Sequence, residues 1–348
     1  MDNPAQTHKR RVRYQGTHPK NYQEKYKELQ PEKYADTVER VIQKGSTPVG
    51  MHLSICVKEI LEFLQIRPGQ TGLDATLGYG GHTLEMLKCL ESKGHLYALD
   101  IDPIELAKTG ARLEHLGYGP DLLTIRQLNF ADIDQVSGAG TLDFVLADLG
   151  VSSMQIDNPD RGFSYKKEGP LDLRLNPEKG ISAAERLKTI TQEELEGMLW
   201  ENADEPYAEE IARAMMMAQK NGKTIATTTE LAQVIEGALA FIPVDQQKEA
   251  VKKSCQRTFQ ALRIDINREF EVLYQFLEKL PDMLAKDGRV AILTFHSGED
   301  RFVKKSFKRL WQEGVYREIS TEVIRPSAQE CNRNGRARST KMRWAVKA

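Results

Sequence analysis

The sequence contains few cysteines, and they are far apart. Cys56, Cys89, Cys255 and Cys331 form no CxxC pair, and no histidine lies at metal-ligand spacing from any of them. This pattern excludes a disulfide framework and predicts reduced thiols in a cytoplasmic protein. We expect no metal site.

Long apolar runs are also missing. Even the strongest, residues 290–295, is far too short to span a bilayer, and no apolar segment follows the basic N-terminus. We therefore expect no membrane partner and no secretory signal. The formal net charge of the 348 residues is −1, so no overall positive field indicates a nucleic-acid partner. Only local charge can support such a partner.

Residues 1–45 are predicted to be a basic N-terminal extension. Lys9, Arg10, Arg11 and Arg13 lie close together there, and tyrosines follow them. A charge run of this kind usually forms a solvated, partly helical segment. It is equally suited to be an arm that contacts RNA phosphates. The sequence leaves both interpretations open.

Short apolar runs alternate with amphipathic helices up to residue 154. The predicted strands are residues 72–76, 95–100, 122–128 and 142–148. Helices are predicted from about residue 82 and over residues 104–116. This alternation indicates an α/β fold with a parallel sheet and right-handed crossovers.

The pattern changes at about residue 155. A turn-rich loop runs to Asn176, and helical segments follow, three of which begin with capping-box spacing. The boxes pair Ser182 with Glu185, Thr191 with Glu194, and Thr227 with Glu230. A helix at 264–280 then leads to strands predicted at 290–295, 315–324 and 341–346. We therefore predict a helical insertion over residues 155–262 in a domain formed by residues 46–154 and 263–348.

A glycine-rich turn follows the first predicted strand, in the string DATLGYGGH at residues 74–82. Glycines let the backbone approach a ligand closely. Asp100 lies 22 residues after Gly78, where an acid accepts hydrogen bonds from ribose hydroxyls. Thr83 replaces the third glycine of a dinucleotide site, and the acidic Asp74 suits the positive amino-acid end of S-adenosylmethionine. The turn therefore favours S-adenosylmethionine over a nicotinamide dinucleotide.

Asp148 ends the fourth predicted strand. Ligands of open α/β sheets lie at the carboxyl ends of strands, so we expect Asp148 to face the same cleft as Asp100. An acid there can hold the exocyclic amine of a base so that its lone pair attacks a methyl group, and positioning contributes more than proton abstraction. The alternative is that Asp148 only caps the next turn.

Six strings together resemble the ribosomal RNA small-subunit methyltransferase H family, from about residue 47 to the C-terminus. They are DATLGYGGH at 74–82, DLGVSSMQID at 148–157, RGFSYKKEGPLDLRL at 161–175, RTFQALRIDIN at 257–267, FHSGEDRFVK at 295–304 and GRARSTKMR at 335–343. The resemblance implies a Rossmann-like class I methyltransferase sheet with an inserted helical domain. It also implies methylation of the exocyclic N4 of a cytosine in the decoding region of 16S rRNA, with S-adenosyl-L-methionine as cofactor.

The resemblance implies cofactor contacts at seven positions, one of which, Asp148, is also the expected catalytic residue. They are Gly80, Gly81, His82, Asp100, Phe130, Asp148 and Gln155. Phe130 follows the third strand, where an apolar ring can stack on adenine.

Aromatic and cationic side chains elsewhere predict RNA contacts. In the 161–174 segment, Arg161, Phe163, Tyr165 and Arg174 suit a base pulled out of its stack, although the segment can also simply tie the insertion to the sheet. Arg336 and Arg338 belong to a C-terminal basic stretch that can neutralise phosphates.

His296 ends a strand at the same edge and either orients substrate or caps the next helix through Glu299. The expected partner is 16S rRNA within the small ribosomal subunit, and the sequence leaves open whether the chain is a homodimer. The competing functions are a nicotinamide-dependent oxidoreductase, a methyltransferase of another RNA cytosine, and a non-catalytic ribosome-assembly factor.

Overall fold

The computed structural model describes residues 54–348, apart from the side chain of Arg333. The predicted extension at residues 1–45 and the first residues of the predicted α/β domain lie outside the described residues. No helix among the described residues is long and apolar enough to cross a membrane.

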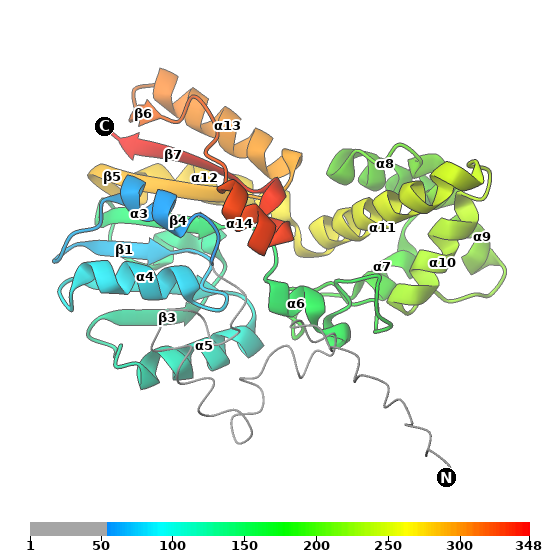
Figure 1. The fold of residues 1–348 in the computed structure, drawn as a ribbon, viewed down its shortest axis with the longest axis horizontal. Coiled ribbons are helices and arrows are strands. Elements are labelled where there is room, and N and C mark those ends of the chain that lie inside the picture. The colour runs from blue at the N-terminus through cyan, green and yellow to red at the C-terminus, as the bar shows by residue number, and fades with distance from the viewer. Residues whose placement is uncertain (1–53) are drawn as a thin grey trace, which may run out of the picture. The chain divides into compact units, whose positions relative to one another are not determined.

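A seven-stranded sheet with the strand order β3-β2-β1-β4-β5-β7-β6 forms the centre of one part of the chain (Figure 1). The strands are β1 (Thr71–Asp74), β2 (His95–Asp100), β3 (Leu123–Gln127), β4 (Leu142–Asp148), β5 (Leu284–Thr294), β6 (Tyr316–Ile319) and β7 (Lys341–Lys347). Strands β1 to β5 are parallel, whereas β7 runs antiparallel between β5 and β6. The predicted α/β fold class is confirmed.

Helices cover both faces of the sheet, because its strands are apolar on both sides. In β4, Phe144 and Leu146 pack with helices α3, α4 and α5, whereas Val145 and Ala147 pack with α12 and α13. The helices of this part are α3 (Val57–Leu64), α4 (Gly81–Leu90), α5 (Pro103–His115), α12 (Glu269–Met283), α13 (Ser297–Gln312) and α14 (Ala328–Arg333), with short 3-10 turns η2 (Phe130–Gln135) and η4 (Gly335–Ser339). Burial on both faces is typical of a parallel sheet.

The chain order creates a topological switch beside β1. From β1 the chain moves outward to β2 and β3, then returns to place β4 on the other side of β1. In open α/β sheets, ligands bind outside the carboxyl ends of the strands at such a point. Asp100 and Asp148 end the two strands that flank β1.

The segment between β4 and α12 is helical and has its own hydrophobic core, whose buried members all lie within residues 163–262. Its elements are α6 (Ser153–Asp157), η3 (Pro159–Arg161), α7 (Ala183–Thr189), α8 (Gln192–Ala203), α9 (Ala208–Lys220), α10 (Thr228–Ala238) and α11 (Val244–Asn267). The three predicted capping boxes are present, at the starts of α7, α8 and α10. They satisfy backbone N–H groups that the first helical turns leave free.

Two predicted elements differ from the structure. The helix predicted at 264–280 is split at Arg268, which adopts a left-handed conformation (φ 50°) between α11 and α12. The strand predicted at 315–324 is limited to β6, and Ile324 forms only an isolated bridge to Met342. Apolar residues lie on both sides of each interruption, so apolar spacing alone did not reveal them.

Candidate active site

The turn between β1 and α4 is held by the two strands that flank β1. The Asp148 backbone N–H donates to the Thr76 hydroxyl (2.7 Å), and the Gly78 N–H donates to Asp100 Oδ2 (2.8 Å). The Leu77 N–H adds a bond to the Leu99 carbonyl. The turn therefore lies between the two acids that sequence analysis placed in one cleft.

Helix α5 fixes the turn from the other side. The Thr109 hydroxyl donates to the Gly78 carbonyl (2.7 Å), and the Arg112 guanidinium lies over the Tyr79 ring, 4.1 Å from its centroid. Gly80 has φ +71°, and a Cβ atom on it would lie 2.7 Å from Thr109 Cγ2. Both facts require glycine at position 80. Gly81 then begins α4.

Asp74 is held by hydrogen bonds within the turn, and its expected role toward the amino-acid end of the cofactor stays a prediction. Its side chain is buried and accepts hydrogen bonds from the Thr83 hydroxyl (2.6 Å) and the Thr76 N–H (3.1 Å). Burial raises the pKa of Asp74, and these hydrogen bonds oppose the rise. Asp74 therefore organises the turn and the start of α4. Thr83, at the place of the third glycine, is its partner.

Asp100 is half-buried at the end of β2. Each carboxylate oxygen accepts one backbone hydrogen bond, Oδ1 from Asp102 N–H (2.8 Å) and Oδ2 from Gly78 N–H. Burial raises the pKa of Asp100 to about 6, although the two hydrogen bonds oppose the rise. Because a carboxylate oxygen has a second lone pair, each can still accept a bond from a hydroxyl group.

Asp148 carries the least satisfied carboxylate of this edge. Its Oδ1 atom is buried and has no hydrogen-bond partner among the described residues, and Oδ2 lies 3.5 Å from His82 Nδ1. Burial raises the pKa of Asp148 to about 6, and His82 opposes the rise. A buried acceptor without a donor is costly unless a ligand supplies one.

His82 is positioned between two acceptors. Its Nε2 lies 2.9 Å from the Ile55 carbonyl oxygen, and its Nδ1 faces Asp148 Oδ2. A neutral imidazole has a single N–H, so it can donate to only one of these two neighbours. His82 and Asp148 therefore form one unit that positions the carboxylate.

Phe130 and Gln155, two further predicted cofactor contacts, are held by packing and hydrogen bonds. Phe130 is half-buried at the start of η2 and packs edge-on against Phe276, with ring centroids 5.2 Å apart. Gln155 is buried, forms a capping box with Ser152, and donates from Nε2 to Asp102 Oδ2 (2.8 Å). Gln155 thus connects α6 to the N-cap of α5.

Two predicted substrate residues, Arg161 and Phe163, need correction. Arg161 is only 6% exposed, and its Nη1 donates to buried Asp102 (2.6 Å) while Nη2 donates to the carbonyls of Arg174 and Leu175. Phe163 is buried in the core of the helical segment. Their side chains are used inside the protein, so neither can contact RNA in this conformation. Arg161 ties the segment to the N-cap of α5, whereas Phe163 ties it to the core of the helical insertion.

Arg174 and Tyr165 differ in the contacts that their side chains make. The Arg174 guanidinium pairs with Asp172 through two hydrogen bonds of 2.8 and 2.7 Å, so its charge is neutralised locally. Tyr165 is half-buried, and its ring packs edge-on against Phe259 with centroids 5.9 Å apart. Of the four residues predicted from this segment, Tyr165 lines a cavity.

The C-terminal arginines also differ. Arg336 Nη2 donates to Asp157 (2.9 Å), whereas Arg338 is exposed and its side chain forms no ion pair with any described residue. His296 Nε2 lies 3.2 Å from Glu299, whose other oxygen accepts the Phe295 N–H. The His296 side chain makes no capping hydrogen bond to the described residues at the start of α13, so both sequence-based alternatives stay open.

Asp102 is the residue of this region that sequence analysis missed. It is fully buried, caps α5 through the N–H groups of Ile104 and Glu105, and accepts from Gln155 and Arg161. Its signal was present in the sequence, since Asp102 precedes Pro103 and lies three residues before Glu105, a typical N-cap pattern.

These residues fit a ligand with a hydroxylated, cationic or amine-bearing surface. Asp148 Oδ1 has no donor among the described residues, and both oxygens of Asp100 can accept further bonds. The described residues place no lysine or arginine in an ion pair with Asp100 or Asp148. Two uncompensated carboxylates disfavour the diphosphate of a dinucleotide.

Known proteins similar to this chain agree with that chemistry. A family model described as the MraW methylase family matches residues 50–348. "Ribosomal RNA small subunit methyltransferase H 1" of Lachnoclostridium phytofermentans is 73% identical, over 100% of this chain and 95% of the relative. "Ribosomal RNA small subunit methyltransferase H 2" of Alkaliphilus metalliredigens is 70% identical, over 100% of both. The unnumbered methyltransferase H of Koribacter versatilis is 39% identical, over 85% of this chain and 94% of the relative.

Among solved structures, a SAM dependent methyltransferase from Aquifex aeolicus aligns with 89% of this chain and 98% of its own, at 10% identity and a TM-score of 0.40. The sequence match covers nearly the whole length of the first two relatives, and the family model spans the entire described part of this chain. The chain therefore belongs to the MraW methylase family.

Proposed function

We propose that this chain transfers a methyl group from S-adenosylmethionine to the exocyclic N4 of a cytosine in the decoding region of 16S rRNA. The observation that carries the proposal is the buried Oδ1 of Asp148 at the carboxyl end of β4, which has no donor in the described part of the chain. The family membership and the names of the relatives support methylation of small-subunit ribosomal RNA. Asp148 adds the reason for an amine as the target.

Residues around the β1–α4 turn would hold the cofactor. Asp100 would accept from the ribose hydroxyls, the backbone of Gly80 and Gly81 would allow close approach, and Phe130 would lie against the adenine. Gln155 would act through Asp102, and His82 through Asp148. When bound, the cofactor supplies an electrophilic methyl group on a sulfonium.

Asp148 would orient the target amine. The lone pair of a cytosine amine is delocalised into the ring, so the amine is a poor nucleophile. An acceptor that holds one N–H favours the geometry in which the lone pair is available, and His82 fixes that acceptor. An ionised Asp148 accepts a stronger hydrogen bond than its neutral form, and a pKa of about 6 leaves it mostly ionised at neutral pH.

A covalent attack on the ring carbon C6 is disfavoured by the state of the cysteines. Cys56 is fully buried, and burial, together with Glu330, Glu59 and Asp148, raises the pKa of its thiol. Burial likewise raises the pKa of Cys255 to about 12. Neither thiol supplies a thiolate at neutral pH. We therefore expect N4-methylcytidine and not 5-methylcytidine.

The helical insertion, residues 155–262, would recognise the RNA, and the domain formed by residues 46–154 and 263–348 would carry the chemistry. A separate core within residues 163–262 supports this division. The substrate would be 16S rRNA in the small subunit, in the cytoplasm. A second candidate is the same reaction on another RNA cytosine, which the numbers 1 and 2 in the names of two relatives, at 73% and 70% identity, favour.

The test uses purified protein, S-adenosylmethionine and small ribosomal subunits from a strain that lacks the gene. Mass spectrometry of nuclease digests identifies the product, and mapping of the modified fragment identifies the site. We expect N4-methylcytidine in the decoding region. N4-methylcytidine elsewhere would support the second candidate, and 5-methylcytidine or no product would contradict the proposal.

A further inference from the structure

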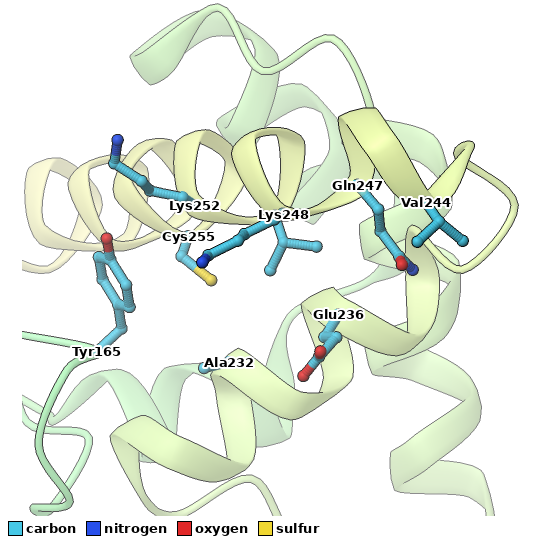
Figure 2. A pocket seen from close by; sticks show the side chains of 9 residues that line it. Tyr165, Ala232, Glu236, Val244, Gln247, Lys248, Lys252 and Cys255 are labelled. Atoms are coloured by element: carbon cyan, nitrogen blue, oxygen red, sulfur yellow. The ribbon is translucent and has the colours of Figure 1, made fainter.

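A cavity of about 490 Å³ lies in the helical insertion, between the loop that carries Tyr165 and helices α10 and α11 (Figure 2). Its volume falls in the range of small-ligand sites, about 300–1,000 Å³. Tyr165 lies on one side, Lys248 and Lys252 extend from α11, and Glu236 extends from α10. We refer to it as the Tyr165 cavity.

The charged groups of the Tyr165 cavity are partly uncommitted. The side chains of Lys248 and Glu236 form no ion pair or hydrogen bond with any described residue. Lys252 lies 3.1 Å from Glu249, an exposed pair that contributes little to stability. The cavity therefore presents both a cation and a carboxylate that are available to a ligand.

An aromatic ring and a buried floor complete the cavity. Phe259 packs edge-on against Tyr165 and holds its ring in place. Cys255 lines the interior, and Glu236 is close enough to contribute to its raised pKa. An ordered aromatic ring at the side of a cavity is a stacking platform for a base.

Further cations flank the loop. Lys166 and Lys167 directly follow Tyr165, both are exposed, and neither side chain forms an ion pair within the described part of the chain. Glu168 follows them and is also exposed, so residues 166–168 carry a formal charge of +1 in a protein whose net charge is −1. Lysines around an aromatic ring are complementary to a nucleotide, whose base stacks while its phosphates meet the cations.

We propose that the Tyr165 cavity binds one unstacked nucleotide of the RNA substrate, separate from the cytosine that is methylated. Tyr165 stacks on its base, and Lys248 and Lys252 contact the flanking phosphates. Glu236 accepts a hydrogen bond from an exocyclic amine, as carboxylates do from cytosine N4. The cavity therefore prefers cytosine to uracil, which has no amine. This inference rests on the proposed function in that it takes RNA as the substrate.

The loop connects this cavity to the methyl-transfer edge of the sheet. Arg161, four residues before Tyr165, is bound to Asp102, which also donates its backbone N–H to Asp100. A nucleotide bound at Tyr165 is therefore bound by a segment that is anchored next to Asp100. Such an anchor limits how RNA can lie relative to Asp148 and contributes to positioning.

The experiment measures binding of fluorescein-labelled pentanucleotides, cytidine-only and uridine-only, to the full-length protein by fluorescence anisotropy. We expect tighter binding of the cytidine oligonucleotide. Tyr165→Ala should weaken that binding roughly 5- to 150-fold, the range expected for loss of base stacking, whereas Tyr165→Phe should retain it. Glu236→Gln should reduce the preference for cytidine over uridine.

Lys248→Ala should weaken both oligonucleotides and lower their salt dependence, whereas the matched control Lys253→Ala, on the same helix but outside the cavity, should not. Unfolding midpoints of all variants establish that they are folded. Folded Tyr165→Ala and Lys248→Ala proteins that bind both oligonucleotides like the wild type would overturn the inference. Failure of the proposed function is distinguishable, since the wild type would then bind RNA without producing methylcytidine.

Discussion

Carboxylates near the carboxyl edge of the sheet occupy two contrasting regions. At the ends of β2 and β4, Asp100 and Asp148 are desolvated and have no lysine or arginine partner among the described residues, and burial raises the pKa of each to about 6. In the contacts that surround the site, which we call the joints, aspartates form ion pairs with arginine or lysine. Asp102 binds Arg161, for example.

The joints illustrate the opposite electrostatic outcome. At Asp300, burial is outweighed by hydrogen bonds from Arg343 (2.7 Å) and Lys341 (2.9 Å), which lower the pKa of the carboxyl group. The same balance at Asp172 comes from Arg174. Paired acids join elements, whereas unpaired, desolvated acids destabilise the folded state and are typical of functional sites. Asp74 is also desolvated and has no cation partner, but both of its oxygens accept hydrogen bonds, whereas Asp148 Oδ1 has no donor among the described residues.

The largest effect is expected from the unpaired region. Asp148→Asn keeps the shape of the side chain and one acceptor oxygen but removes the charge, so the methyl-transfer rate should fall about 10²-fold or more. The cofactor dissociation constant should change only modestly. Single-turnover kinetics and calorimetry measure the two quantities.

Asp143→Asn is the matched control, because Asp143 lies at the amino end of the same strand and accepts the Thr71 N–H (2.8 Å). It should retain the wild-type rate. A fully active Asp148→Asn enzyme would show that the unpaired carboxylate is not part of the reaction.

The next effect concerns the paired region. Arg161→Ala leaves Asp102 buried without its cation, so the free energy of unfolding should fall by about 3–5 kcal/mol. Urea denaturation measures the change. An unchanged unfolding midpoint combined with weaker RNA binding would contradict this structural role. It would support the sequence-based prediction that Arg161 contacts RNA.

Asp100→Ala should act on cofactor affinity. Loss of hydrogen bonds to a charged group should weaken S-adenosylmethionine binding by about 1.5–3 kcal/mol. Calorimetry of the folded variant tests this. Unchanged affinity would remove Asp100 from the ribose site and leave it only its bonds to Gly78 and Asp102.

The smallest effect distinguishes two neighbouring arginines. Arg338 is exposed and unpaired within the described residues, so Arg338→Ala should raise the apparent KM for RNA a few-fold and flatten its salt dependence. Arg336 is bonded to Asp157, so Arg336→Ala should have a weaker effect on salt dependence. Kinetics at several salt concentrations compare them. Equal salt slopes for the two variants would contradict the assignment.

Sequence patterns predicted the parts of the fold that local rules control. The parallel strands, the glycine turn and the three capping boxes follow from apolar spacing and hydrogen-bonding rules. The sequence also predicted that Asp100 and Asp148 end strands of one sheet. In the structure they end the two strands that flank β1.

Pairing between distant residues could not be predicted in the same way. Arg161 lies 59 positions from Asp102, and nothing in its own segment reveals that its charge is neutralised there. Phe163 looks the same in the sequence whether it stacks on a base or joins a core. The cavity at Tyr165 is formed together with α10 and α11. Its lining residues Glu236 and Lys248 on these helices lie 70 or more positions after Tyr165 in the chain.

The central claim is that Asp148 is kept ionised for function at the expense of stability, whereas Asp300 is kept ionised for stability. A pKa raised to about 6 in the folded state, from an ordinary value of 3.8, means that this carboxyl group destabilises the fold as the pH rises through 6. Asp148→Asn should therefore stabilise the protein by about 1–3 kcal/mol at pH 7.5, and the gain should disappear below about pH 4. Asp300→Asn should destabilise it by about 2–4 kcal/mol, because Arg343 is left buried without a charge partner.

The measurement that tests this claim most directly is the urea unfolding midpoint of the two variants against the wild type at pH 7.5. We predict shifts of opposite sign, with Asp148→Asn above the wild type and Asp300→Asn below it. Two shifts of the same sign and similar size would contradict the account, because the carboxylates at the ends of the strands would then be structural groups like those in the joints.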